Sequence, residues 1–179
     1  MQDGVSSYHR YLQGDGNALE ELVALYSDAL IRFAACYVRN FADAEDIAED
    51  SFVALILKKK HFKEDAALKA YLFKICRNKC LDFLRRNKRL TALEDWAKSE
   101  DAEALLARRD RDRILYAALG RISEQYRDIL YLTYIEGFSA DECTRILKKS
   151  NKQVYNLLHR AKEALRAQLE KGGFKHENL

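Results

Sequence analysis

Proline is absent from the 179 residues of this sequence, and long apolar runs are absent as well. Without proline, only glycine and capping residues remain to end or bend a helix. No apolar run approaches the roughly 20 residues needed to span a bilayer, so we expect no membrane insertion. The first residues, MQDGVSSYHRYLQGDG, lack the basic and then apolar pattern of a signal peptide, which predicts a cytoplasmic protein.

Cysteine is scarce, with four residues and no framework-like spacing, which predicts reduced thiols. Cys76 and Cys80 lie four residues apart, a spacing that places two thiols on one helical face and invites a metal-site interpretation. Both fall on the apolar stripe between Leu72 and Phe83, however, where a reduced Cys behaves as a small hydrophobe. A zinc site needs about four ligands, and no nearby Cys or His pair completes one. We therefore predict no metal site and no cofactor.

Charge is distributed unevenly, although the net charge is only +3. Counting Lys and Arg against Asp and Glu, residues 1–57 carry −7 and residues 58–90 carry +9. Residues 91–110 carry −3, and residues 111–179 carry +4. Two basic blocks separated by an acidic one indicate a polyanionic partner contacted at two places. Ordinary solvated helix faces are the alternative for either block alone.

Apolar periodicity predicts helices in the first half of the chain. Residues 17–39 carry one apolar stripe with three- and four-residue spacings. A second helix is predicted over DAEDIAEDSFVALILKK, residues 43–59, whose carboxylates at the start and lysines at the end complement the helix dipole. Residues 58–68 are predicted to form a loop with a helix restart. The next apolar stripe begins at Leu68, and its helix ends near Asn87.

The second half has clearer helix boundaries. Ser123 is predicted to cap a helix that Gly137 ends. SADE then pairs Ser139 with Glu142 in a capping box at the start of a short helix, and SNKQ, residues 150–153, repeats this pattern before a long helix. Short helix, tight turn and long polar helix is the order of a helix-turn-helix, whose last helix enters a major groove. An ordinary helical hairpin is the alternative.

The predicted fold class is all-α, with two helical domains. Residues 90–110 have weaker periodicity and more acid, which is typical of a linker. We therefore predict a first domain over residues 1–90, a linker over 91–110 and a second domain over 111–171. The last residues, 172–179, are predicted to be a flexible tail.

Two motif sets, in order along the chain, resemble those of one known family. AEDIAEDSF and YLFKICRNKCLDFLRR are similar to the paired signature of sigma-70 region 2, a helical bundle. IEGFSADECTRILKKSNKQVYNLLHRAKEALR is similar to region 4, a helix-turn-helix. The short spacing between them resembles the extracytoplasmic function (ECF) subgroup. The resemblance covers about residues 17–170 and implies a bacterial transcription initiation factor rather than an enzyme.

The resemblance also implies partners and contact residues. The expected partners are core RNA polymerase, through its β′ clamp helices and β flap, promoter DNA, and the anti-sigma factor that holds many relatives. The positions that match the family's polymerase contacts are Asp46, Glu49, Asp50 and Val53. Those that match contacts to the melted −10 element are Lys59, Lys60, Lys63, Lys74, Arg77, Asn78, Lys79, Arg85 and Arg86. Those that match contacts to the −35 duplex are Lys152, Gln153, Tyr155, Asn156, His159 and Arg160, with Lys152 on phosphate.

A few positions depart from the family pattern. Glu49 stands where glutamine is usual, and Cys143 replaces the usual isoleucine of the helix-turn-helix. Tyr155 and Asn156 stand where basic and hydroxyl residues are frequent, which leaves the preferred −35 sequence open.

Two other functions fit parts of the sequence. A helix-turn-helix regulator that does not bind polymerase accounts for residues 111–171 but leaves the charged helices of 41–89 unused. A helical metal-dependent hydrolase would use the carboxylates Glu45, Asp46, Glu49 and Asp50. These lie in one short run, and no second run of ligands such as ExxH is present to face them.

Overall fold

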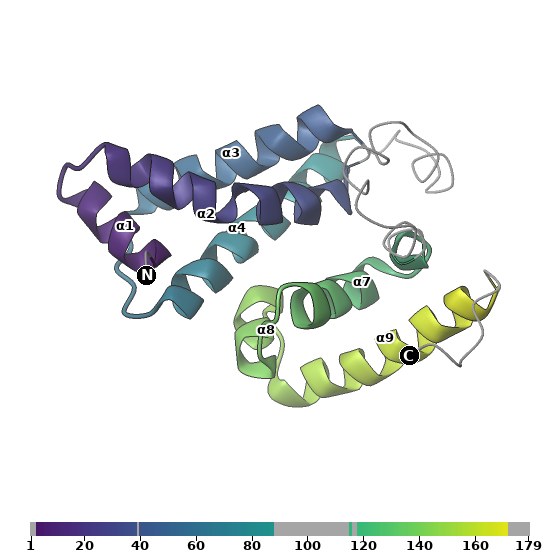
Figure 1. The fold of residues 1–179 in the computed structure, drawn as a ribbon. Helices are drawn as coiled ribbons and strands as arrows, with labels where there is room; N and C mark the ends of the chain where they lie inside the picture. Colours follow the sequence, from purple (N-terminus) through teal and green to yellow (C-terminus); the bar gives the residue numbers. More distant parts are fainter. Residues whose placement is uncertain (1–2, 39, 88–114, 116–117, 172–179) are drawn as a thin grey trace. The chain divides into compact units, whose positions relative to one another are not determined.

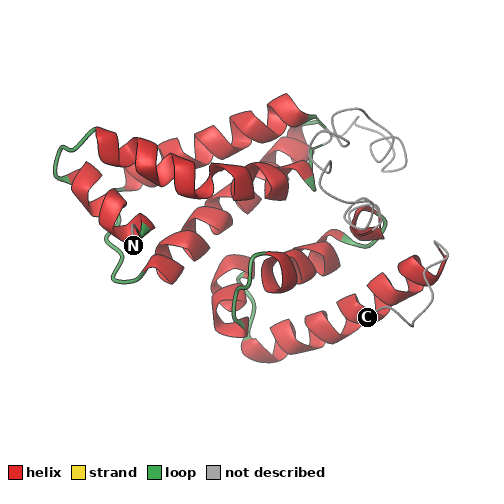
Figure 2. Cartoon of the chain, viewed as in Figure 1, coloured by secondary structure: helices red, strands yellow, loops and turns green. Residues whose placement is uncertain are grey.

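The computed structural model describes residues 3–38, 40–87, 115 and 118–171, and this part of the chain contains helices but no strand (Figure 1, Figure 2). The all-α fold class that the periodicity predicts is confirmed. The described residues form two compact units, one holding α1 to α4 and the other α7 to α9. The predicted linker and the predicted tail lie outside the described residues, so the domain bounds stay predictions.

The first unit is a helical bundle. Its described helices are α1 (Gly4–Leu12), α2 (Asn17–Ala35), α3 (Phe41–Lys58) and α4 (Asp65–Arg86). The sequence analysis predicts α2, α3 and α4 close to these bounds, but it does not predict α1. Asp3 caps α1, since its carboxylate accepts a 2.7 Å hydrogen bond from the backbone N–H of Ser6.

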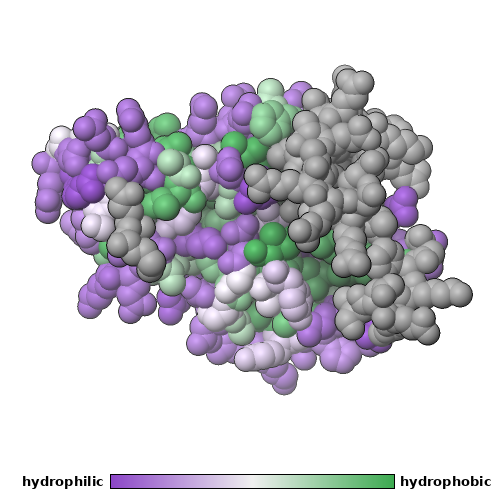
Figure 3. Space-filling model, in the orientation of Figure 1, coloured by the Kyte–Doolittle hydropathy of each residue, from purple (hydrophilic) through white to green (hydrophobic). Residues whose placement is uncertain are grey.

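The core of the first unit is formed by the apolar faces of its helices. Leu30 and Phe33 of α2 are fully buried, as are Leu72 and Phe73 of α4. The rings of Phe33 and Phe73 lie 5.3 Å apart, so they join the two helices through an aromatic contact. Among the coloured residues on the visible face in Figure 3, hydrophilic side chains predominate, with smaller hydrophobic patches between them. The charged residues thus lie on the surface of a well-packed helical bundle.

The ends of α3 fix where its charged face begins and where the next loop starts. The Asn40 side chain accepts a 2.9 Å hydrogen bond from the backbone N–H of Ala42 and caps the helix. At the other end, Lys59 adopts a left-handed conformation with φ of 44°. A left-handed residue ends a helix and redirects the chain. This bend begins the loop of residues 59–64, which lies inside the segment 58–68 predicted as a loop with a helix restart.

The second unit departs from the prediction in its first helix. The helix predicted from Ser123 to Gly137 is divided into α7 (Glu124–Leu130) and a π-helical turn (Tyr131–Ile135). Ser123 occupies the N-cap position, but its side chain makes no capping hydrogen bond, so that part of the prediction is wrong. Its backbone carbonyl instead accepts from the N–H groups of Tyr126 and Arg127. Gly137 does end this segment, with φ of 73°.

The predicted helix-turn-helix order is present in α8 (Ala140–Leu147) and α9 (Asn151–Lys171). The capping box at Ser139 is confirmed, because the Ser139 and Glu142 side chains each accept from the other residue's backbone N–H. Ser150 and Gln153 pair in the same way, at 2.9 and 3.3 Å. These local bonds fix the first turn of α9.

Cys76 and Cys80 are both fully buried in α4, which confirms their predicted place on its apolar face. The Cys76 thiol also contacts the backbone carbonyl of Leu30, at 3.9 Å. In the double variant Cys76→Ala with Cys80→Ala we expect a loss of about 1–3 kcal/mol in the free energy of unfolding, because two buried heavy atoms leave cavities. Denaturant unfolding measures this loss. Metal analysis of the unaltered protein should find no stoichiometric zinc, and one zinc per chain that disappears in the variant would contradict the packing interpretation.

Candidate protein and nucleic-acid interfaces

One face of α3 is acidic in its first half and apolar in its second. The predicted polymerase contacts Asp46, Glu49, Asp50 and Val53 are all exposed. They repeat at three- and four-residue spacings, which places them on one side of the helix. Val53 is 52% exposed, and Leu57, four residues later on the same side, is 75% exposed. Leu57 is not among the predicted contacts, although its spacing from Val53 could have indicated it. This face suits a partner that offers both basic and apolar groups.

An ion pair links the acidic face to the basic helix. The Lys79 ammonium of α4 lies 3.1 Å from the Asp50 carboxylate of α3. The sequence assigns these residues to different partners, the polymerase and the −10 DNA, and the structure brings them together. Because both side chains are solvent-accessible, the pair contributes at most about 1 kcal/mol. Either residue can therefore exchange this contact for one with a macromolecule.

The basic residues of α4 fall into two groups. Lys74, Arg77, Asn78 and Lys79 are partly buried along the middle of the helix. Arg85 and Arg86 are exposed in its last turn, where Arg85 pairs with the Asp82 carboxylate. Cations in a last turn also complement the helix dipole, so those two have a structural role as well.

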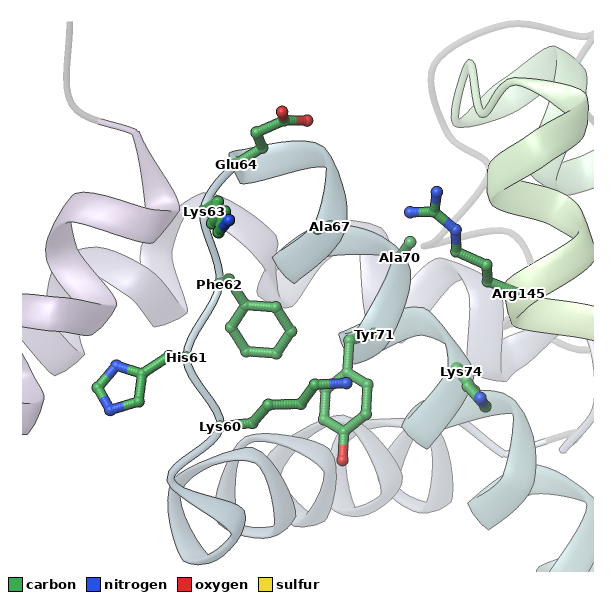
Figure 4. Close-up of a pocket in the computed structure, with 10 residues that line it drawn as sticks. All are labelled: Lys60, His61, Phe62, Lys63, Glu64, Ala67, Ala70, Tyr71, Lys74 and Arg145. Carbon is green, nitrogen blue, oxygen red and sulfur yellow. The ribbon is translucent and has the colours of Figure 1, made fainter.

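The loop of residues 59–64 combines cations with aromatic rings. Lys59, Lys60 and Lys63 are exposed, whereas Phe62 is buried. The Lys60 ammonium lies 4.6 Å from the centroid of the Tyr71 ring in α4 (Figure 4). Positive groups interleaved with aromatic rings are what unpaired nucleotides bind.

Phe62 and Tyr71 are absent from the predicted contacts. Their rings lie 5.3 Å apart and share the Lys60 ammonium, which is 5.6 Å from the Phe62 centroid. The sequence shows both aromatics close to the basic residues, but it does not tell a core aromatic from one at a surface. Tyr71 is only partly buried, and this separates it from Phe62.

The first half of α9 presents the predicted −35 contacts to solvent. Lys152, Gln153, Tyr155, Asn156, His159 and Arg160 are all exposed. The Gln153 side-chain oxygen accepts a hydrogen bond from the backbone N–H of Ser150. The NH₂ group of the Gln153 side chain can therefore still donate to a base. His159 lies 3.6 Å from the Glu163 carboxylate, one turn further along.

A hollow of about 300 Å³ lies beside this face, between the start of α7 and α9. Gln153, Asn156 and Arg160 line it, and so do three residues that the sequence analysis does not select, Gln125, Tyr126 and Lys149. Lys149 lies in the turn before α9, next to the capping box, and that position could have pointed to it. The hollow therefore extends the polar and basic surface of α9 to the turn and to α7.

Cys143 belongs to the interior of the helix-turn-helix. It is fully buried in α8, and its thiol lies 3.8 Å from the Thr133 hydroxyl. Burial raises the pKa of the Cys143 thiol, which keeps it neutral. It packs where the family usually has an apolar side chain.

The described residues hold no group of three or more His, Cys, Asp and Glu side chains placed to bind a metal ion. The carboxylates Glu45, Asp46, Glu49 and Asp50 thus gather no further ligand within the described part, which leaves the hydrolase alternative without a site there. Among the described helices, none has the length and apolarity to span a membrane.

Comparisons with known proteins agree with this geometry. Residues 22–90 match the family Sigma-70 region 2, and residues 112–165 match the family Sigma-70, region 4. The RNA polymerase sigma factor NccH of Alcaligenes xylosoxydans xylosoxydans is 31% identical over 172 residues, which cover 90% of this chain and 91% of NccH. The RNA polymerase sigma factor SigV of Bacillus subtilis is 28% identical over 143 residues, with coverage of 78% and 84%.

A solved structure shares the fold. It contains CnrH, an RNA polymerase sigma factor of Cupriavidus metallidurans, in complex with the cytosolic domain of CnrY. The TM-score is 0.70 at 27% sequence identity, and the match covers 94% of this chain and 97% of CnrH.

Proposed function

Since the chain belongs to the sigma-70 family, in its ECF subgroup, we propose how its exposed surfaces are divided between RNA polymerase and promoter DNA. The protein is a transcription initiation factor and not an enzyme. It binds core RNA polymerase and directs it to promoters. The division of its surfaces rests chiefly on one observation: the acidic contacts of α3 and the contacts of α9 are exposed, while the basic contacts lie apart from both, on α4 and the loop before it.

The acidic and apolar face of α3 is the proposed contact with the β′ clamp helices. We assign Asp46, Glu49, Asp50 and Val53 to it, as the family pattern suggests, and add Leu57 because it is exposed on the same side. Charge complementarity would steer the encounter, and the two apolar side chains would be buried on docking. A regulator that does not bind polymerase would have no partner for this face.

The loop of residues 59–64 and the basic side of α4 are the proposed site for the melted −10 strand. The cations would follow the phosphates, and partly buried Tyr71 offers a ring face to an unpaired base. Asn78 lies among the half-buried polar residues of α4 and can donate and accept hydrogen bonds with a base edge.

The first half of α9 is the proposed reader of the −35 duplex, in the major groove. Asn156 and Arg160 would contact base edges, while Lys152 and Lys149 would contact phosphates beside the hollow. We further propose domain bounds of 1–90 and 111–171 and a place in the cytoplasm, where polymerase and DNA are found. CnrH is bound to the cytosolic domain of another protein, CnrY, which supports a further protein partner for this chain, and we propose an anti-sigma factor in that role.

The division of labour is tested with Asn78→Ala. We expect this variant to form fewer open complexes on duplex promoters and to keep its −35 preference, because Asn78 lies on α4 and not on α9. A promoter library with duplex and pre-melted −10 templates measures both properties. If Asn78→Ala changed the −35 preference, the assignment of the two units would be wrong.

The polymerase part is tested separately by co-purification with core RNA polymerase. Stable co-purification is expected for the full chain. A chain that bound promoter DNA but never core polymerase would favour the alternative of a helix-turn-helix regulator.

A further inference from the structure

Helix α1 contacts the loop of residues 59–64 along much of its length. Tyr8 of α1 is fully buried, and its hydroxyl donates a 3.3 Å hydrogen bond to the backbone carbonyl of Leu55. That carbonyl belongs to the last turn of α3, where carbonyl groups lack helical partners. One side chain of α1 therefore holds the end of α3, from which the loop departs.

The middle of the loop is also held by α1. The Phe62 ring is packed between Tyr8, at 5.8 Å, and Tyr71 of α4, at 5.3 Å. His61 points away from Phe62 and Tyr71 (Figure 4), and its ring lies 5.9 Å from that of His9 in α1. Two successive loop residues are thus fixed by two successive residues of α1.

The end of the loop is tied to α1 through Asp65, the first residue of α4. Its carboxylate accepts a 3.2 Å hydrogen bond from the backbone N–H of Val5 and a 2.7 Å hydrogen bond from the Tyr26 hydroxyl. Gly4 fits against that hydroxyl so closely that a Cβ atom there would lie 2.4 Å from it. Helix α1 therefore contacts the middle of the loop and the helix ends on both sides of it.

Two further observations point to a role beyond stability. The Nε2 atom of His9 is buried and has no hydrogen-bond partner within the described residues, an arrangement that costs free energy rather than supplying it. In addition, α1 precedes residues 22–90, the part that matches Sigma-70 region 2. The contacts to the loop thus come from a helix outside the region that the family model matches.

We infer that α1 positions the loop of residues 59–64 for recognition of the −10 element, with Tyr8 and His9 as positioning residues that do not themselves contact DNA. The inference rests on the proposed role of this loop in −10 binding. Lys60 and Lys63 present their charges from a loop whose middle packs on α1 and whose flanking helix ends hydrogen-bond to α1. Preorganisation of this kind raises affinity, because the loop spends no binding free energy on ordering itself. It also raises selectivity, because a fixed loop cannot rearrange to accept other bases.

The variant Tyr8→Phe tests the inference, because it keeps the ring on Phe62 and removes only the hydroxyl. We expect trypsin to cleave after Lys60 and Lys63 about 3- to 10-fold faster under native conditions, the range for one lost hydrogen bond. We also expect a broader choice of bases in a randomised, pre-melted −10 library bound by the holoenzyme. His9→Ala should act in the same direction, and His9→Phe should restore the selection because it keeps a ring against His61.

The matched control is Tyr37→Phe, which removes the hydroxyl of another buried tyrosine whose ring packs on Phe33 instead of the loop. If Tyr8 had a purely structural role, Tyr8→Phe and Tyr37→Phe would select the same −10 bases whenever they lost the same free energy of unfolding. Unchanged cleavage in Tyr8→Phe, or faster cleavage with unchanged −10 selection, would overturn the inference. The loop variant Lys63→Ala separates the two proposals: if it alters −10 binding while Tyr8→Phe does not, only the inference fails, and if neither does, the proposed role of the loop fails too.

Discussion

Glu49→Lys should weaken binding to core RNA polymerase by about 5- to 150-fold, which corresponds to about 1–3 kcal/mol. Glu49 is exposed in the middle of the acidic half of α3, one turn before Val53. Reversing its charge places a cation where the partner is expected to be basic, so attraction becomes repulsion. Because Glu49 is exposed, the folded domain should keep its stability.

The structure makes Glu49 a better choice than Asp50 for this test. Asp50 already pairs with Lys79, so Asp50→Lys would also break a contact within the domain and free a cation of the −10 surface. Glu49→Lys leaves that pair in place. Titration of labelled protein with core polymerase, at two salt concentrations, measures the effect and its screening.

A matched charge reversal away from this face provides the control. Glu20 is exposed in the first turn of α2, and Glu20→Lys changes the net charge by the same amount. It should leave the affinity for core polymerase within about a factor of two, since distant surface charges are screened. Equal affinities of the unaltered protein and Glu49→Lys would remove the assignment of the α3 face.

Local signals account for the helices that the sequence predicts correctly. The acidic start of α3, the apolar stripe of α4 and the capping boxes at Ser139 and Ser150 are all read from residues within one or two turns. Interactions of this range do not depend on the rest of the fold. The exposed faces of α3 and α9 follow from the same periodicity, because the polar residues opposite the apolar stripe of an amphipathic helix face solvent.

Helix α1 is not predicted because its stability comes from distant parts of the chain. Its sequence, GVSSYHRYL, is short and poor in strong helix formers. Tyr8 contacts Leu55 and Phe62, which lie about 50 residues later. The Asp50–Lys79 pair is likewise invisible in the sequence, because it depends on how α3 packs on α4. The sequence also does not show that the Tyr71 ring is half-exposed while the Phe62 ring is buried, because this depends on the tertiary packing.

The second unit should separate base recognition from phosphate recognition. Asn156 is exposed on α9 and lines the hollow beside Arg160. A short amide can pair with a base edge in the major groove, which is worth about 1–3 kcal/mol of discrimination. Asn156→Ala should therefore change which −35 sequences the holoenzyme uses, with a loss of up to about 100-fold at the preferred base and little change elsewhere.

Lys152→Ala is the comparison that makes the result interpretable. Lys152 is exposed in the first turn of α9, where a cation reaches phosphate, so its loss should weaken all −35 sequences by a similar factor. It should also reduce the slope of log K against log salt concentration by about one phosphate contact. Binding of a randomised −35 library at several salt concentrations measures both effects. A uniform loss of binding in Asn156→Ala, or a change of sequence preference in Lys152→Ala, would reverse the two assignments. A defect in −10 binding in either variant would show that the assignment of α9 to the −35 element is wrong.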